Sequence, residues 1–128
     1  MSKEFIPYEE ALALKELGFD EPCLAFYETN SVGSVRRLNT KDLEEDFEYA
    51  DYECYAPLYQ QAFRFFREEY RLVCGVREVS KGKYSFEIKR WEDYSFSSIL
   101  RWFDSWAVAE LDGLRKLIEI VNQNKEDE

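Results

Sequence analysis

The segment Leu72–Trp91 constrains the fold of this chain most, because it has the pattern of an antiparallel β-hairpin. Its second half alternates apolar and polar side chains, as a strand with one buried face does. The turn Ser80-Lys81-Gly82 joins that half to the strand predicted over Leu72–Val79. We therefore expect an antiparallel sheet with one apolar face. The apolar side chains of the second strand are Tyr84, Phe86 and Ile88, and the polar ones are Ser85, Glu87 and Lys89.

Three segments have the pattern of amphipathic helices. The first runs from Pro7 to Gly18, and the second begins near Pro57, since proline suits the first turn and glycine the end of a helix. The third begins at a cap, Asp104 or Ser105. Its apolar face comprises Ala107, Leu111, Leu114, Leu117, Ile118 and Val121, and the helix is predicted to end at about Val121.

Three further segments are predicted to be extended. Cys23–Tyr27 is a mostly apolar run that indicates a buried strand, and residues 30–34 resemble a hairpin tip. Val35–Leu38 is a short return strand, although its two arginines weaken that pattern. Ser95–Phe103 fits a strand or an extended segment better than the opening of the last helix.

Together these segments predict an α+β fold in which three helices pack on a mostly antiparallel sheet of four to five strands. The segments Tyr8–Leu12 and Tyr59–Phe63 are similar, which would fit a duplicated α-β-β unit closed by a third helix. Two helix starts built alike would explain the same similarity. A length of 128 residues favours a single domain, 1–128, with residues 122–128 as a polar, frayed tail.

The composition supports a folded chain inside the cell. Apolar residues make up 45% and aromatic residues 17%, enough to build a core. No apolar stretch approaches the roughly 20 residues that span a bilayer, and the N-terminus has no secretory signal, so we expect a cytoplasmic protein. Cys23, Cys54 and Cys74 are odd in number and form no C-x-x-C pair. We therefore expect neither a disulfide framework nor a structural zinc site.

The formal net charge of −10 limits the classes of partner. Nucleic-acid phosphates require a concentrated basic face, so direct nucleic-acid binding is disfavoured, and anionic membranes are disfavoured for the same reason. A basic protein surface is compatible with this charge, which also keeps a protein soluble.

The residue types argue against catalysis. The chain has no histidine, which removes Ser–His and Cys–His machinery and most catalytic zinc sites. No glycine-rich loop precedes a helix, so a phosphate cradle is absent. We therefore expect no enzyme activity, no cofactor, and no catalytic or metal-binding residues. The alternative is a small hydrolase or nuclease that uses carboxylates and a divalent metal.

The segment Asp42–Cys54 is the most acidic part of the chain, since seven of its thirteen residues are acids and none is basic. It could be a solubilising loop whose aromatic side chains pack on the core. It could instead bind a basic protein surface, with carboxylates in the positions that phosphates would occupy and aromatic anchors between them. The candidate partner-binding residues are Asp42, Glu44, Glu45, Asp46, Phe47, Glu48, Tyr49, Asp51 and Tyr52.

A second aromatic group lies between Trp91 and Trp106. Alternation over residues 97–103 would bury Ile99 and either Trp102 or Phe103, which leaves an aromatic ring for the surface. An exposed tryptophan would indicate an interface, and Trp102 is the candidate. The competing interpretation is that all these rings pack in the core.

Three blocks of the sequence together cover about half of the chain: Glu4–Cys23, Ala56–Tyr70 and Leu114–Val121. They resemble a family of small uncharacterised phage and prophage proteins associated with Bacteroidetes. The acidic segment and the region Trp91–Trp106 depart from that family. The resemblance implies a phage or prophage origin, a single-domain architecture and a location in the host cell cytosol. It implies no activity and no functional residues.

The leading functional hypothesis is therefore a non-enzymatic, protein-binding accessory protein of phage or prophage type, acting on a host or phage protein. The second is a counter-defence inhibitor whose acidic face mimics nucleic acid. The third is the carboxylate-based metal enzyme. A homodimer is a further possibility, because surplus aromatic side chains often serve self-association.

Overall fold

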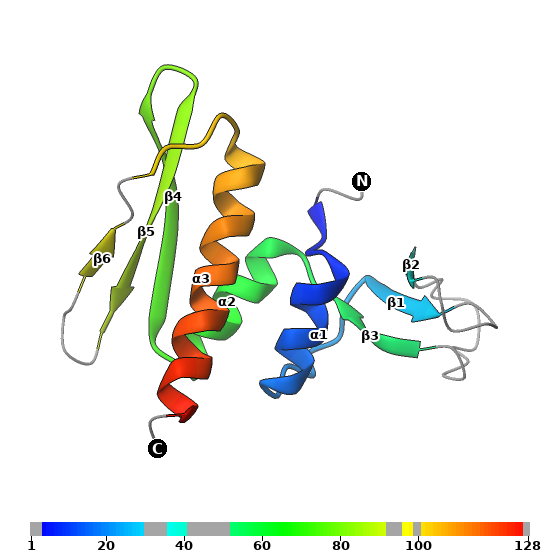
Figure 1. The fold of residues 1–128 in the computed structure, drawn as a ribbon. Helices are drawn as coiled ribbons and strands as arrows, with labels where there is room; N and C mark the ends of the chain where they lie inside the picture. The colour runs from blue at the N-terminus through cyan, green and yellow to red at the C-terminus, as the bar shows by residue number, and fades with distance from the viewer. Residues whose placement is uncertain (1–3, 30–35, 41–51, 92–95, 99–100, 127–128) are drawn as a thin grey trace. The chain divides into compact units, whose positions relative to one another are not determined.

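The computed structural model describes residues 4–29, 36–40, 52–91, 96–98 and 101–126. Within them the order of elements is α1 (Tyr8–Glu16), β1 (Ala25–Thr29), β2 (Arg36–Thr40), β3 (Tyr52–Ala56), α2 (Tyr59–Glu69), β4 (Leu72–Ser80), β5 (Lys83–Arg90), β6 (Phe96–Ser98) and α3 (Trp106–Glu126) (Figure 1). The α+β class, the three helices and the antiparallel pairing are confirmed. The chain divides into two compact units, residues 1–60 and residues 61–128, so whether it is a single domain stays a prediction.

The strands of the described residues form two antiparallel three-stranded sheets, with orders β2-β1-β3 and β4-β5-β6, where we expected one sheet of four to five strands. A helix followed by three strands occurs twice, and α3 follows, which resembles the suggested duplication. The strand orders differ, however, because the first strand is central in one sheet and the second strand in the other. The repetition is therefore one of element order and not of sheet topology.

In the first unit, α1 packs on β3 and is closed by a glycine. Gly18 has φ +100°, and its N–H donates to the carbonyl of Lys15 at 3.1 Å, while Phe19 N–H donates to the carbonyl of Leu14 at 2.9 Å. These two bonds form a Schellman motif, in which a left-handed residue satisfies the last helix carbonyls. The predicted helix end is thus confirmed.

Tyr27 of β1 holds the N-terminal segment in this unit. Its buried hydroxyl donates to the carbonyl of Ile6 at 2.8 Å, and its ring meets the edge of Tyr8 at a centroid distance of 5.5 Å. Ile6 N–H donates in turn to the carbonyl of Pro57 at 3.0 Å. Ile6 and Pro57 are both fully buried, so these contacts tie the chain before α1 to the segment after β3.

Strand β3 was not anticipated, because it lies at the end of the acidic segment. Its neighbour β1 was predicted, and Ala25 of β1 pairs with Ala56 of β3. Acidic residues are depleted in strands, so the sequence around Glu53 and Cys54 indicated a loop. Cys54 is nevertheless fully buried. The fit of one small apolar side chain into the core outweighs the low strand preference of its neighbours.

In the second unit, α3 lies along β4 and β5, and β6 pairs with the other edge of β5 (Figure 1). The predicted hairpin is confirmed, with Val76 opposite Phe86 and Cys74 opposite Ile88, and Gly82 has φ +74° at the turn. The extended segment is confirmed at β6 and at Phe103, which forms a bridge with Tyr84. The buried apolar side chains of this sheet, of α3 and of the segment before it are Leu72, Phe86, Ile88, Phe103, Ala109, Leu114, Leu117 and Val121.

Helix α3 differs from its prediction in two ways. Ala107 is exposed, because the buried face is set by Ala109, Gly113, Leu117 and Val121, each one turn apart. The helix also continues past Val121 to Glu126. Residues 122–126 are all exposed, so apolar periodicity could not mark the end of the helix there.

Gly113 allows α3 to approach the sheet closely. A Cβ atom at this position would lie 2.8 Å from the Sγ atom of Cys74 and 3.3 Å from a ring carbon of Phe86. Both distances are shorter than ordinary van der Waals contact, which begins near 3.5 Å. Glycine is less favourable than alanine in a helix by about 1 kcal/mol, and the close packing of α3 on the sheet offsets this cost.

We expect Gly113→Ala to lower the free energy of unfolding by roughly 1–2 kcal/mol, because overpacking outweighs the gain in helix propensity. In a Cys74→Ala background the same change should cost less, since the nearest clashing atom is gone. Urea unfolding of both pairs measures the difference. Gly75→Ala is the matched control, because its Cβ would meet nothing within 4 Å. An equal effect of Gly113→Ala in both backgrounds would rule out the contact with Cys74.

The turn between α2 and β4 carries backbone strain. Arg71 has φ +59°, in the left-handed region that glycine adopts without cost. Its carbonyl accepts a hydrogen bond from Trp91 N–H at 3.2 Å, so the turn is held by the neighbouring strand. A single residue, Arg71, thus reverses the chain from the helix into the sheet.

Replacing Arg71 by glycine should raise the free energy of unfolding by up to about 1 kcal/mol, because the left-handed conformation then carries no steric cost. The control is Arg67→Gly, which lies inside α2 and is exposed. That change should lower stability by about 1 kcal/mol through lost helix propensity. Thermal and urea unfolding of both variants show whether each change raises or lowers the free energy of unfolding. Destabilisation by Arg71→Gly would contradict the assignment of backbone strain to Arg71.

Candidate functional site

The predicted acidic face cannot be placed. Residues 42, 44–49 and 51 lie outside the described residues, and Tyr52 is described only as the first backbone position of β3. The binding role of Asp42, Glu44, Glu45, Asp46, Phe47, Glu48, Tyr49, Asp51 and Tyr52 therefore stays a prediction. Trp102, the remaining candidate, is described and is 58% exposed.

Trp102 is the first of three large apolar side chains of residues 102–108 that are exposed on the second unit. Its companions are Trp106, which is 47% exposed, and Val108, which is 53% exposed. We call the region of these three side chains the tryptophan surface. Trp106 and Val108 are two residues apart in a helix and lie on different sides of α3, so the name denotes the mostly exposed stretch 102–108. The three side chains come from the segment before α3 and from the first turn of that helix. The sequence had singled out Trp102 alone, and Val108 was missed because a single valine in a helix start carries no signal by itself.

The bridge between Phe103 and Tyr84 decides which ring is exposed. Tyr84 N–H donates to the carbonyl of Phe103 at 2.8 Å, and Phe103 N–H donates to the carbonyl of Tyr84 at 2.7 Å. The ring of Phe103 is buried and stacks with Phe86 at a centroid distance of 6.2 Å. Successive side chains of an extended segment point to opposite faces, so burial of Phe103 directs Trp102 outward.

Trp106 is held by two contacts on its own unit. Its ring meets the edge of Tyr84 at 6.2 Å, and its Nε1 atom donates to Glu110 at 3.4 Å, one helical turn away. Partial burial raises the pKa of the Glu110 carboxyl, an effect that the hydrogen bond from Trp106 opposes. The indole is therefore oriented while nearly half of it is open to solvent.

Charged side chains border this surface. Lys83 and Asp104 form an ion pair, and that hydrogen bond and charge hold the pKa of the Asp104 carboxyl below its usual range. Both side chains are exposed, so the pair contributes little to stability. The guanidinium of Arg101 lies 5.3 Å from the ring centre of Phe103.

Val108 occupies a position where an acid would be more stabilising. Ser105 is the N-cap of α3, and its Oγ atom accepts the Val108 N–H at 3.1 Å. The third residue after a serine cap is where glutamate completes a capping box, yet the first turn of α3 contains no acid. An exposed valine there neither fills the core nor caps the helix.

The third tryptophan lies apart in the sequence, immediately after β5. Trp91 is 41% exposed, and the ammonium of Lys89 lies 4.5 Å from its ring centre. Since a cation already covers one face of this ring, Trp91 serves below as a matched control for the tryptophan surface.

Catalytic and metal chemistry gain no support from the described residues. No group of three or more His, Cys, Asp or Glu side chains within them is arranged to hold a metal ion. Cys23 and Cys54 are buried, and burial raises the pKa of the Cys74 thiol to about 12. A thiol that stays protonated is a poor nucleophile.

No helix among the described residues has the length and apolar character required to cross a membrane.

No family model, curated protein or solved structure matches this chain. The resemblance to phage and prophage proteins therefore stays a prediction.

The raised pKa of Cys74 predicts a loss of stability at high pH. Above pH 9 the thiol ionises in the unfolded chain, but in the folded chain it stays protonated up to about pH 12. Ionisation therefore stabilises the unfolded state relative to the folded state over this range. The free energy of unfolding should fall over this range by at most about 1.4 kcal/mol per pH unit from this group. Tyr27, whose pKa burial raises from 10.0 to about 12, adds to the fall above pH 10.

Cys74→Ala should make the fall between pH 9 and pH 10 shallower, as measured by urea unfolding at a series of pH values. Its effect at pH 7 gives the packing contribution separately. Parallel pH profiles for the two proteins would refute the role of this thiol.

Proposed function

We propose that this chain is a non-enzymatic protein-binding domain and that the tryptophan surface contacts the partner. The observation that carries this proposal is the exposure of three large apolar side chains within seven consecutive residues, Trp102, Trp106 and Val108, next to the bridge that fixes Phe103. Tryptophan is enriched among the residues that dominate binding energy.

The two tryptophan side chains can supply part of the free energy of binding to a partner. A buried aromatic side chain covers about 150–250 Å², so a half-exposed indole offers roughly 100 Å². At about 25 cal/mol per Å², each tryptophan would contribute roughly 2–3 kcal/mol when covered. Trp106 is already oriented by Tyr84 and Glu110, which reduces the entropy lost on binding.

The distribution of charge along the chain lets an experiment distinguish this proposal from the nucleic-acid mimic. Residues 1–60 contain five basic and fourteen acidic residues, a formal charge of −9, whereas residues 61–128 contain twelve and thirteen, a charge of −1. The tryptophan surface lies on the nearly neutral unit. Binding through it should therefore change little with salt, whereas binding through the acidic segment should weaken as salt screens the charges.

The partner is proposed to be a host or phage protein, in keeping with the phage and prophage resemblance of the sequence. The class of this partner follows from the surface itself: an apolar cleft that accepts tryptophan side chains. A second copy of the chain satisfies the same description and is distinguished by measuring the oligomeric state.

The decisive variant is Val108→Glu, which places a charge in the tryptophan surface while completing the capping box with Ser105. We expect the melting temperature to stay the same or rise, since an acid in the first turn stabilises a helix by about 0.3–1 kcal/mol. Capture of the partner from a lysate of a bacterial host should be lost. The readout is affinity capture at several salt concentrations, followed by mass spectrometry.

Trp102→Ala should weaken the same interaction by about 2 kcal/mol or more, as expected of a binding hot spot. Trp91→Ala is the matched control, and it should leave capture unchanged. If Val108→Glu and Trp102→Ala both retain the partner, the tryptophan surface is not the interface. If binding is also lost as the salt concentration rises, the acidic segment is the interface instead.

A further inference from the structure

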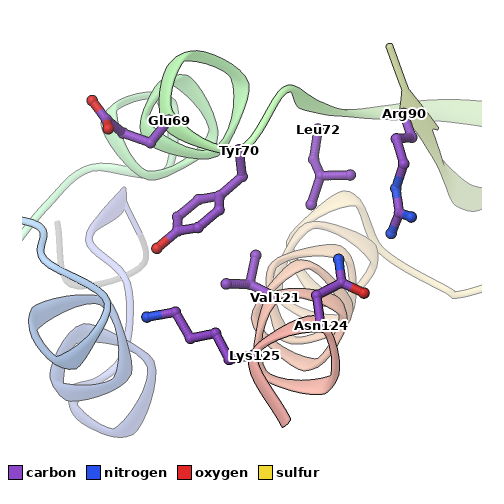
Figure 2. Close-up of a pocket in the computed structure, with 7 residues that line it drawn as sticks. All are labelled: Glu69, Tyr70, Leu72, Arg90, Val121, Asn124 and Lys125. Atoms are coloured by element: carbon purple, nitrogen blue, oxygen red, sulfur yellow. The ribbon is translucent and has the colours of Figure 1, made fainter. Parts of the chain in front are cut away.

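A surface pocket lies at the end of α3 opposite to the tryptophan surface. It has a volume of about 290 Å³ and is lined by seven side chains of the second unit (Figure 2). A rise of 1.5 Å per residue places Lys125 roughly 28 Å along α3 from Trp106, so a ligand in the pocket does not touch the tryptophan surface. The lining residues are Glu69, Tyr70, Leu72, Arg90, Val121, Asn124 and Lys125.

The fold brings these side chains together for simple reasons. Leu72 and Arg90 are directly opposite in the pairing of β4 with β5, so their side chains share one face of the sheet. Val121, Asn124 and Lys125 are spaced i, i+3 and i+4, so they share one face of α3. Leu72 and Val121 are both buried and form an apolar floor.

Tyr70 forms a rigid wall of the pocket. Its ring lies 5.7 Å from that of Phe65 and 6.0 Å from that of Phe66, and its N–H donates to the carbonyl of Phe66 at 3.0 Å. The left-handed residue Arg71 follows and turns the chain into β4. The wall is therefore oriented before any ligand arrives.

Two of the side chains that line the pocket are cationic. Arg90 and Lys125 approach the floor from opposite sides, and the carboxylate of Glu69 points away from it in the view of Figure 2. Neither Arg90 nor Lys125 has an ion pair within the part of the chain that the structure describes. In a chain of net charge −10, two cations facing one pocket favour an anionic ligand.

The helix ends limit the charge of that ligand. Helix α2 ends at Glu69 and α3 at Glu126, and the carbonyl groups of a helix C-terminus carry about half a negative charge. The positive charge of Lys125 offsets the partial negative charge at the end of α3. Arg90 lies on a strand, so its charge is available to pair with a ligand. Its planar guanidinium matches a carboxylate in a bidentate geometry. A monoanion suits these surroundings better than a phosphate dianion.

We propose that this pocket binds a small organic carboxylate. The carboxylate pairs with Arg90, and its apolar body lies on Leu72, Val121 and the ring of Tyr70. A pocket of this volume is at the lower end of the range for small-molecule sites, so the ligand is smaller than a typical drug.

The test is a titration of the full chain followed by two-dimensional NMR, with 3-phenylpropionate as the probe. The neutral amide of this probe shows whether the negative charge is required, and phenyl phosphate shows whether a dianion binds as well. Acetate, which lacks the phenyl ring, shows whether the apolar body contributes. We expect shifts at Tyr70, Leu72 and Val121, and a dissociation constant for the carboxylate roughly tenfold lower than for the amide. Phenyl phosphate and acetate should bind more weakly.

Arg90→Gln should remove the preference for the carboxylate over the amide, and Lys125→Gln should reduce it. Arg77→Gln is the matched control, because Arg77 is an exposed residue of β4 that does not line the pocket. Equal binding of acid and amide by the unchanged protein overturns the proposal, as does a preference that survives Arg90→Gln or an absence of shifts at the pocket. The ligand series on the unchanged protein decides the matter even if Arg90→Gln fails to fold. Neither outcome depends on the tryptophan surface.

Discussion

The packing of α3 on β4 and β5 governs the arrangement of the second unit. This contact is close because Gly113 has no side chain to collide with Cys74 and Phe86. Hydrophobic burial supplies the driving force, through Leu114, Leu117 and Val121 on the helix and Phe86 and Ile88 on the sheet. One long helix fixed in this way presents a defined group of side chains at each of its ends.

At the two ends of this unit, residues depart from the choice that would stabilise the fold most. Val108 occupies a position where glutamate would complete a helix cap, and Arg71 adopts a conformation suited to glycine. Such departures are expected where a residue serves something other than stability. One lies on the tryptophan surface, and the other follows Tyr70, which lines the pocket.

The two units of the chain differ in physical character. The first carries almost all of the net charge, −9 of −10, and is organised around α1, β3 and the buried hydroxyl of Tyr27. The second is nearly neutral and exposes Trp102 and Trp106. Electrostatic attraction acts over a Debye length of about 8 Å at physiological salt, whereas apolar contact requires direct burial. In the proposed function, charge would therefore act at longer range than the contact made by the tryptophan side chains.

Local patterns in the sequence determined the elements of this fold. The alternation in Lys83–Arg90, the glycine after α1 and a cap at Asp104 or Ser105 before α3 each predicted a structure that is present, with Ser105 as the cap. These predictions succeeded because alternation, helix caps and turn residues depend on near neighbours only. Strand β3 escaped prediction because burial of Cys54, a tertiary effect, outweighed the acidic composition around it.

Only the tertiary structure decided which side chains came together and which remained exposed. The sequence could not choose between Trp102 and Phe103, since both fit an alternating strand, and the bridge to Tyr84 selected Phe103 for the core. The pocket joins residues as distant as Tyr70 and Lys125, which no local pattern connects. Nor could hairpin patterns reveal that the strands divide into two sheets, because edge-to-edge pairing depends on contacts between distant segments.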